Sequence, residues 1–405
     1  MIQRPVYLKR IEPFINKTEL VKIFTGIRRC GKSMMMELVK QSLRENDVPE
    51  TNIISINFDN LQFAELLDYK KLHDHIMQKA HGSTGTVYVF LDELQEVQAW
   101  EKCVNSLRSQ SHFDIYVTGS NSHLLSSEYA TYLAGRYVSF TIYPFSFKEF
   151  TDVYRQKKGT ASVSEMFTSF IEFGGMPGLS QLELNADVTA PFLQDIYNSV
   201  VLKDVIQHGK IHDTELLERI CRFVMANAGK TFSATGISKY LKNERRKTTP
   251  ETVLHYLICC EDAYLFYKAK RYDVPGKKML SVQEKEYIAD HGLRQAVVGR
   301  NTDSIETVLE NIVYLELLRR GYTVYVGKIE AAEIDFIAEK QNGAEKMYIQ
   351  VAYLLSTAEC IEREFSPLEK ISDNFPKLVL STDPLPVSGR NGIERKDIAM
   401  WLLEE

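Results

Sequence analysis

The stretch GIRRCGKS, residues 26 to 33, decides the fold of this 405-residue chain. It follows the apolar run VKIFT, residues 21 to 25, and precedes a segment with helical periodicity that begins MMMELVK. The sequence therefore predicts a strand, a glycine-bounded loop and a helix, in that order. Gly26 and Gly31 allow the sharp turn and the close approach of backbone to a ligand that such a loop needs.

The composition of this loop predicts a binding site for phosphate groups. Backbone N–H groups between two glycines can point at phosphate oxygens, and the positive end of the following helix adds to the attraction. The pattern G-x-x-x-x-G-K-[ST] assigns Lys32 to the β- and γ-phosphates and Ser33 to Mg²⁺. The predicted nucleotide contacts are Gly26, Ile27, Arg28, Arg29, Cys30, Gly31, Lys32, Ser33 and Met34. A chance match in a loop is the alternative, which the strand–loop–helix context disfavours.

The whole-chain composition is that of a globular protein with ample core. Hydrophobic residues make up 44%, charged residues 25%, and the net charge is −5, which argues against a uniformly basic surface. No apolar stretch of about 18 residues and no apolar leader are present, which predicts a cytoplasmic protein without a membrane segment. The six cysteines form no C-x-x-C pair and indicate reduced thiols. Cys30 lies inside the loop, where amide dipoles could lower its pKa for a redox role; a tolerated small residue is the favoured interpretation.

Two carboxylates follow the next clearly buried strand. The apolar run from Val87 to Leu91 leads directly into Asp92 and Glu93. Ligands bind at the carboxyl ends of parallel strands, so these acids are expected beside the phosphate loop. Asp92 is predicted to hold Mg²⁺, and Glu93 to act as general base toward water, which favours ATP hydrolysis over phosphoryl transfer by a small kinase. A pair of solvated acids is the alternative.

A third strand and a later glycine–arginine pair complete the predicted site. The strand ending at Thr118 is followed by Ser120 and Asn121, which are predicted to face the γ-phosphate as a sensor; a helix N-cap is the alternative. Arg136 follows Gly135 in an otherwise apolar segment and is predicted to stabilise charge on the transferred phosphate, in cis or from a neighbouring subunit. A structural ion pair is the alternative.

Four stretches together, GIRRCGKS, FLDELQEV, YVTGSNSHLL and LAGRYVSFTIYPFSFKEF, resemble the AAA-type ATPases of bacteria and archaea. The likeness is to the branch that carries a C-terminal domain of uncharacterised function. It implies a five-stranded ASCE-type core, with ATP and Mg²⁺ held by Lys32, Ser33 and Asp92, water by Glu93, and Ser120 and Asn121 as sensor. Arg136 matches the glycine–arginine pair of that family.

The fold class expected is therefore α/β, with a P-loop NTPase core on a parallel sheet, followed by a helical and winged-helix region and by an α/β region that resembles a restriction nuclease. The predicted divisions are an ATPase domain at 1–155, a helical lid or linker at 156–213, a winged-helix-like domain at 214–300 and a nuclease-like domain at 301–405. The turn FGGMPGL, residues 173 to 179, interrupts the helical region.

The winged-helix expectation rests on three helical segments followed by a β ribbon around Pro275-Gly276. Between Lys239 and Lys278 there are ten Lys or Arg against five Asp or Glu, so this basic window carries +5 and the rest of the chain −10. DNA is one predicted partner of this window. Protein binding or self-association is the other.

The last region resembles the PD-(D/E)xK nuclease fold through Glu310, Glu333 and Asp335 and the strand at 347–353. Where that family carries acid-x-lysine, this chain has Gln350-Val351-Ala352. Metal-assisted hydrolysis needs both the acid and the lysine, so the region is predicted to be inactive as a nuclease. The function predicted for the chain is Mg²⁺-dependent ATP hydrolysis coupled to the C-terminal regions; a slow nucleotide switch and a DNA-processing protein are the alternatives.

Overall fold

The computed structural model describes residues 2–120, 122, 135–244, 246–276, 278–299, 305–340, 343, 345–383 and 389–404. The chain forms two compact units. The N-terminal unit comprises Met1–Tyr143 with Asp262–Tyr264, and the C-terminal unit comprises Pro144–Glu261 with Leu265–Glu405. The N-terminal unit thus ends at Tyr143, whereas the sequence suggested a boundary at residue 155. No helix within the described ranges has the length and apolar character to cross a membrane.

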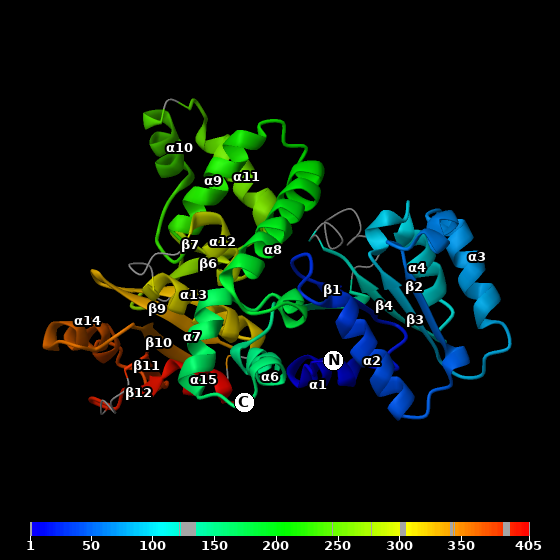
Figure 1. The fold of residues 1–405 in the computed structure, drawn as a ribbon, viewed down its shortest axis with the longest axis horizontal. Helices are drawn as coiled ribbons and strands as arrows, with labels where there is room; N and C mark the ends of the chain where they lie inside the picture. The colour runs from blue at the N-terminus through cyan, green and yellow to red at the C-terminus, as the bar shows by residue number, and fades with distance from the viewer. Residues whose placement is uncertain are drawn as a thin grey trace. The chain divides into compact units, whose positions relative to one another are not determined.

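A five-stranded parallel sheet forms the centre of the N-terminal unit (Figure 1). Its strand order is β2–β3–β4–β1–β5. The strands are β1 (Val21–Thr25), β2 (Ile53–Asn57), β3 (Val87–Asp92), β4 (Phe113–Thr118) and β5 (Tyr137–Thr141). The apolar runs predicted β1, β3 and β4, whose side chains are all buried because these central strands are covered on both faces. The edge strands β2 and β5 are only partly buried. The predicted α/β core with a parallel sheet is confirmed.

Helices cover both faces of this sheet (Figure 1). They are α1 (Pro5–Ile11), α2 (Lys32–Glu45), α3 (Tyr69–Ala80) and α4 (Trp100–Arg108). Apolar residues of α3 and α4, such as Leu72 and Val104, pack with alternate residues of β1 to β4 in one core. The Lys40 side chain of α2 lies over the Phe90 ring of β3, which points to the opposite face. The phosphate loop is therefore fixed between a buried strand and a packed helix.

A buried ion pair joins the two central strands. Lys22 of β1 pairs with Asp114 of β4, and both side chains are fully buried. The Asp114 carboxylate also accepts hydrogen bonds from the Tyr116 hydroxyl and from the backbone N–H of Asn16. Burial lowers the pKa of Lys22, and Asp114 opposes that shift. Such a pair is costly to break, because removing one partner leaves the other charge buried.

The C-terminal unit combines helices with a seven-stranded mixed sheet (Figure 1). Its helices are α6 (Phe147–Lys158), α7 (Val163–Phe173), α8 (Ala186–Ser199), a π-helical turn (Val200–Gln207), α9 (Thr214–Ala226), α10 (Ala234–Asn243), α11 (Pro250–Asp262), α12 (His291–Val298), α13 (Ile305–Arg319), α14 (Ala358–Glu369) and α15 (Ile398–Leu403). Ser146 with Glu149, and Ser162 with Glu165, form capping boxes that start α6 and α7.

The sheet of this unit has the order β12–β11–β10–β9–β8–β6–β7. Its strands are β6 (Phe266–Asp273), β7 (Lys278–Ile288), β8 (Thr323–Ile329), β9 (Ala332–Glu339), β10 (Lys346–Val351), β11 (Lys377–Ser381) and β12 (Glu394–Asp397). The β6–β7 ribbon, expected as the wing of a separate domain, pairs with β8 and forms the edge of this sheet. The boundary suggested at residue 300 therefore divides a continuous sheet.

The turn after α7 is packed too tightly for any residue but glycine. The backbone N–H of Gly175 donates to the buried Asp290 carboxylate over 2.7 Å, and its C=O accepts from Phe145 over 2.7 Å. A Cβ added at Gly174 would lie 2.3 Å from Asp290 Oδ1, and one at Gly175 would lie 2.3 Å from the Phe145 carbonyl oxygen. The glycine pair seen in the sequence thus lets the chain after α7 contact both the start of α6 and the start of α12.

Candidate functional site

The phosphate loop follows the end of β1 and has the backbone that its glycines predicted. Gly26 has φ 133° and Gly31 has φ 101°, while Arg29 between them has φ 64°. A Cβ at Gly26 would lie 2.2 Å from the carbonyl oxygen of Ile142, so space as well as conformation requires glycine there. Gly31 is the N-cap of α2, and the helix begins at Lys32.

Within the loop, the side chains divide into buried and exposed groups. Ile27 and Cys30 are fully buried, which leaves only their backbone groups for a ligand. Arg29, Ser33 and Met34 are exposed, and Arg28 is half-buried. Burial raises the pKa of the Cys30 thiol more than the nearby cations lower it. The thiol is therefore not the activated group that a redox role would need, and the interpretation as a tolerated small residue is the better one.

The Lys32 side chain folds back onto the phosphate loop and bonds to its backbone. Its side chain is 4% exposed, and Nζ donates to the carbonyl oxygens of Gly26 and Ile27 over 3.0 and 3.3 Å. The ammonium group thus lies across the mouth of its own loop, where phosphate oxygens could take the place of the two carbonyls. This position agrees with the role predicted for Lys32.

Asp92 lies at the end of β3 and is hydrogen-bonded to the Ser33 side chain. Burial raises its pKa, although hydrogen bonds from Thr118 and Ser33 lower it. Asn57 Nδ2 donates to its second oxygen over 3.2 Å. A buried carboxylate beside a hydroxyl offers the hard oxygen ligands that Mg²⁺ prefers, and a cation there would offset the cost of burying the charge. The two residues predicted for the metal therefore lie together and fit Mg²⁺.

Thr118, the last residue of β4, connects the two acids of the site. Its fully buried hydroxyl donates to Asp92 Oδ1 over 2.6 Å and accepts the backbone N–H of Glu93 over 2.8 Å. Glu93 has φ 56°, a left-handed conformation that is uncommon for a residue with a side chain. Its carboxylate accepts a hydrogen bond from Gln95. Thr118 thus fixes the backbone of the predicted general base as well as the predicted metal ligand.

The remaining predicted residues fall in three different situations. Ser120 is buried, two residues after the end of β4. Asn121 lies outside the described residues. Arg136 is exposed, and its carbonyl oxygen accepts a hydrogen bond from the N–H of Val21 at the start of β1.

Arg136 therefore lies at the amino edge of the sheet. Val21 pairs with Tyr137, and the phosphate loop follows Thr25 at the other end of β1, about 13 Å away at ~3.3 Å per residue. A residue that precedes a parallel strand lies at the opposite edge from the loops that follow the strands, so this position does not favour action of Arg136 on the phosphate in cis, and that role stays a prediction. A role from a neighbouring subunit stays a prediction.

Arg4 is a residue of this site that sequence reasoning missed. It is 1% exposed, and its guanidinium donates to the carbonyl oxygen of Cys30 over 3.3 Å and to that of Tyr143 over 2.8 Å. The Tyr7 hydroxyl accepts the N–H of Tyr143 over 3.0 Å. The N-terminal segment thus holds the phosphate loop against the chain that follows β5. No local pattern in residues 1 to 20 indicates this contact, since the partners are distant in sequence.

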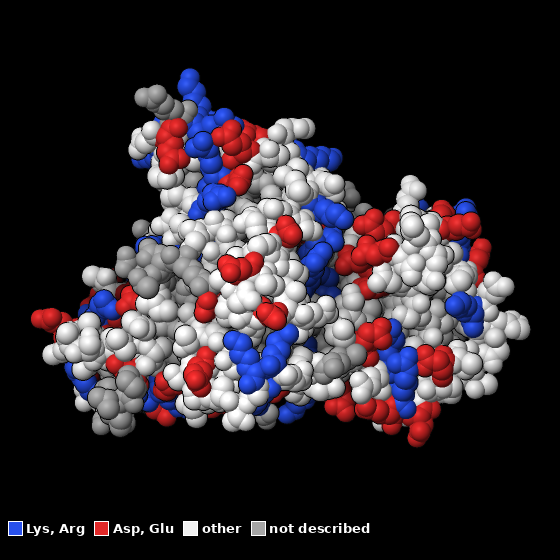
Figure 2. Space-filling view, viewed as in Figure 1, with Lys and Arg blue, Asp and Glu red and all other residues white. Residues whose placement is uncertain are grey.

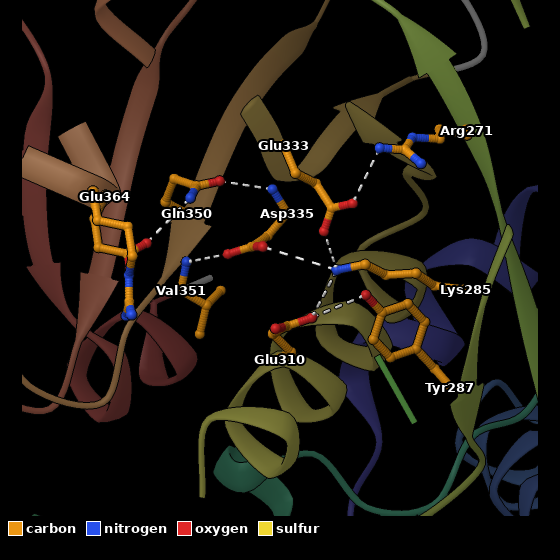
Figure 3. Close-up of polar contacts among 10 residues, drawn as sticks. Arg271, Lys285, Tyr287, Glu310, Glu333, Asp335, Gln350, Val351 and Glu364 are labelled. Atoms are coloured by element: carbon orange, nitrogen blue, oxygen red, sulfur yellow. Dashed lines mark hydrogen bonds and ion pairs between the residues drawn. The ribbon is translucent and has the colours of Figure 1, made fainter. Parts of the chain in front are cut away.

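The residues that resemble a nuclease centre also lie together (Figure 3). Glu310 of α13 and Glu333 and Asp335 of β9 surround the Lys285 ammonium of β7, with Nζ–O distances of 3.4, 2.7 and 4.0 Å. Gln350 of β10 accepts the N–H of Asp335 over 2.7 Å and donates to Glu364 over 3.1 Å (Figure 3).

The position of Lys285 changes the sequence-based account of this cluster. The acid-x-lysine stretch does lack its lysine, but a lysine from the β6–β7 ribbon lies among the carboxylates instead. Burial lowers the pKa of Lys285, and the charges of Glu310, Asp335 and Glu333 outweigh that effect and raise it above its ordinary value. Burial also raises the pKa of Asp335. The ammonium is thus a charged partner of these acids, and inactivity as a nuclease stays a prediction.

Part of the positive charge of the basic window is paired with carboxylates, two of which come from outside the window. Lys and Arg over α9 and α10 are interspersed with Asp and Glu on the visible face (Figure 2). Three of its cations form ion pairs: Arg246 with Asp213, Lys268 with Glu261, and Arg271 with Glu333. The third helix of the predicted winged helix, α11, contains no Lys or Arg. These three pairs reduce the positive charge that the window count of +5 suggested.

Comparison with known proteins identifies two regions of the chain. Residues 18–151 match the model of an AAA domain, and residues 164–304 match a domain of unknown function, DUF8612. An uncharacterized protein of Haemophilus influenzae is 36% identical over 100% of this chain and 99% of its own length. An uncharacterized protein of Methanocaldococcus jannaschii is 28% identical, over 91% of this chain and 81% of its own.

Two solved structures resemble the chain more remotely. A signal transduction ATPase with numerous domains from Pyrococcus horikoshii has 14% identity and a TM-score of 0.30, covering 79% of this chain, which spans about half (47%) of that one. The Aeropyrum pernix ORC1 protein in complex with DNA has 11% identity and a TM-score of 0.32, covering 73% of this chain and 92% of that one. Scores this low carry no argument about fold or partner. The near full-length match shows the family: the chain belongs to the same family as the Haemophilus influenzae protein. The match to the AAA model shows that its N-terminal unit carries an AAA domain.

Proposed function

We propose that this protein hydrolyses ATP to ADP and phosphate in the presence of Mg²⁺. The observation that carries the proposal is the continuous set of hydrogen bonds from Ser33 through Asp92 and Thr118 to the backbone of Glu93. It joins the phosphate loop to the acids that follow β3. An incidental pair of solvated acids would not be buried and bonded to the loop in this way.

Each side chain has a defined role in the proposed reaction. The loop N–H groups and Lys32 bind the phosphates, and Ser33 and Asp92 would hold Mg²⁺. When bound, Mg²⁺ neutralises phosphate charge and favours departure of ADP. Glu93 accepts a proton from the attacking water. Arg28 and Arg29 are the cations that the loop itself offers to the transferred phosphate, since Arg136 lies at the other edge of the sheet.

The test is phosphate release from MgATP by the purified chain. Lys32→Ala should abolish nucleotide binding or hydrolysis, because the loop loses the charge that binds the β- and γ-phosphates. Lys79→Ala, at an exposed position of α3, is the matched control and should retain the wild-type rate. Equal rates for wild type and Lys32→Ala would contradict the proposal.

A second candidate is a nucleotide-dependent switch in which hydrolysis is slow. The Arg4 contact favours it, because one guanidinium holds both Cys30 of the loop and Tyr143, the last residue before Pro144. The chain then continues to Phe145, which bonds to Gly175 of the glycine-rich turn. A change in the loop could thus be passed along the chain into residues 156–213 and the two regions beyond. A burst of phosphate without sustained turnover would favour the switch.

The C-terminal unit would bind the partner to which ATP hydrolysis is coupled. DNA and protein are the two candidate partners of the regions at 214–300 and 301–405. The ion pairs within the basic window favour protein, since phosphates would have to compete with internal carboxylates. ATPase rate measured with and without DNA, at two salt concentrations, distinguishes them: DNA-dependent stimulation that falls steeply with salt would favour DNA.

A further inference from the structure

Three residues at the C-terminal end of α11 belong to the N-terminal unit, although their neighbours on both sides in the chain do not. Asp262–Tyr264 are grouped with Met1–Tyr143, whereas Glu261 and Leu265 belong to the C-terminal unit. Ala263 in the middle of this segment is fully buried. Neither the sequence motifs nor the proposed reaction accounts for these residues.

Tyr264 contacts the base of the phosphate loop. Its hydroxyl is hydrogen-bonded to the side chain of Thr25, the last residue of β1 before Gly26. Cys30 of the loop is near enough to interact with it electrostatically. The backbone of Tyr264 has φ 56°, a left-handed conformation that is rare for a bulky aromatic residue. Such a conformation persists only where surrounding contacts hold it. Residues in such conformations cluster at ligand sites.

Asp262 contacts the chain that follows β4. Its Oδ1 accepts a hydrogen bond from the Ser122 hydroxyl over 2.6 Å. Ser122 follows β4 by four residues, and β4 is the neighbour of β1, with Thr118 paired to Phe24. One short segment is therefore bonded to the chain just before the phosphate loop and to the chain that follows Thr118 and Ser120.

We propose that Asp262–Tyr264 is a positioning segment of the nucleotide site, which fixes the phosphate loop through Thr25 and the end of β4 through Ser122. This inference rests on the proposed function. The Thr25 contact acts on the part of the loop that binds the phosphates common to ATP and ADP. The Ser122 contact acts on the strand end that faces the γ-phosphate. By linkage, nucleotide binding must also favour the bonded conformation of the segment, which the chain joins to α11 and β6.

The experiment compares three variants that each remove one polar group and keep the fold. Tyr264→Phe removes the hydroxyl bonded to Thr25 and keeps the ring. Ser122→Ala removes the hydroxyl bonded to Asp262. Tyr256→Phe removes another tyrosine hydroxyl of the same region, on α11 in the C-terminal unit, and is the matched control. Affinities for MgATP and MgADP are measured with a fluorescent nucleotide, together with kcat.

The expected pattern differs between the two contacts. Tyr264→Phe should weaken both MgATP and MgADP by about 3- to 10-fold, the effect of losing one buried hydrogen bond. Ser122→Ala should lower kcat and MgATP affinity by a similar factor and leave MgADP affinity unchanged. Tyr256→Phe should match wild type in all three. If the segment had a merely structural role, each variant would either weaken the affinities for MgATP and MgADP equally or leave both unchanged.

The inference is overturned if Tyr264→Phe and Ser122→Ala bind and hydrolyse like Tyr256→Phe while Lys32→Ala abolishes binding; the proposed function then stands alone. If wild type binds no nucleotide, the proposed function fails and this inference fails with it. If Tyr264→Phe does not fold, the split between ATP and ADP in Ser122→Ala decides the question.

Discussion

Thr118→Val is the substitution that most directly probes how the acids of the site are held. Valine keeps the shape of the buried side chain and removes the hydroxyl that donates to Asp92 and accepts from the Glu93 backbone. A hydrogen bond to a charged group contributes about 1.5–3 kcal/mol, and the Glu93 N–H is left without its acceptor. If this loss falls on the transition state, kcat should drop by about 10- to 100-fold.

The assay is steady-state phosphate release at saturating MgATP, with unfolding by urea measured in parallel. Thr151→Val is the matched control, because Thr151 is also a buried threonine whose hydroxyl donates a hydrogen bond, but it lies in α6 of the C-terminal unit. It should show a similar loss of stability with kcat unchanged. A Thr118→Val protein with the wild-type kcat would refute the reasoning that this hydroxyl positions the catalytic acids.

Three further predictions concern stability. Asp114→Ala leaves the buried Lys22 ammonium without its partner and should lower the free energy of unfolding by about 3–5 kcal/mol; a loss under ~1 kcal/mol in urea titration would contradict the buried-pair argument. Gly175→Ala should lower the melting temperature, because its Cβ would lie 2.3 Å from a backbone carbonyl oxygen, whereas Gly236→Ala in α10, with its nearest contact at 3.4 Å, should raise or keep it. Burial and neighbouring Glu261 raise the pKa of Glu286 from 4.5 to about 8, so ionisation destabilises the folded state between these pH values. The free energy of unfolding of Glu286→Gln should therefore rise relative to that of wild type as pH increases from 4 to 9. A difference between the two proteins that does not depend on pH would count against the raised pKa of Glu286.

The N-terminal unit was predictable because its chemistry is local in sequence. The three central strands of its sheet, β1, β3 and β4, are short and mainly apolar runs, and the functional groups follow directly: the loop after Thr25, the acids after Leu91 and the polar residues after Thr118. The carboxyl ends of parallel strands meet at one edge, so the runs alone predicted that Ser33 and Asp92 would be neighbours. The same rule, applied to the residue before a strand, would have placed Arg136 at the far edge.

What the sequence could not show depends on contacts between distant segments. Arg4 meets Cys30 and Tyr143 only after the sheet has formed. The β6–β7 ribbon looked like an independent wing because its partner, β8, begins some way along the chain at Thr323, beyond two helices. For the same reason, Lys285 was missed as the cation of the C-terminal acidic cluster, since its side chain reaches Asp335 only in the folded sheet, where β6 and β8 lie between their two strands.

We propose that Glu93 activates the attacking water, whereas MgATP binding does not require the Glu93 carboxylate. The most direct measurement is the pair of MgATP affinity and phosphate release for Glu93→Gln, which keeps the size and hydrogen bonding of the side chain and removes its basicity. We expect wild-type affinity within about 3-fold and turnover reduced by roughly 100-fold or more. Wild-type turnover in this variant would contradict the assignment of Glu93 as the general base.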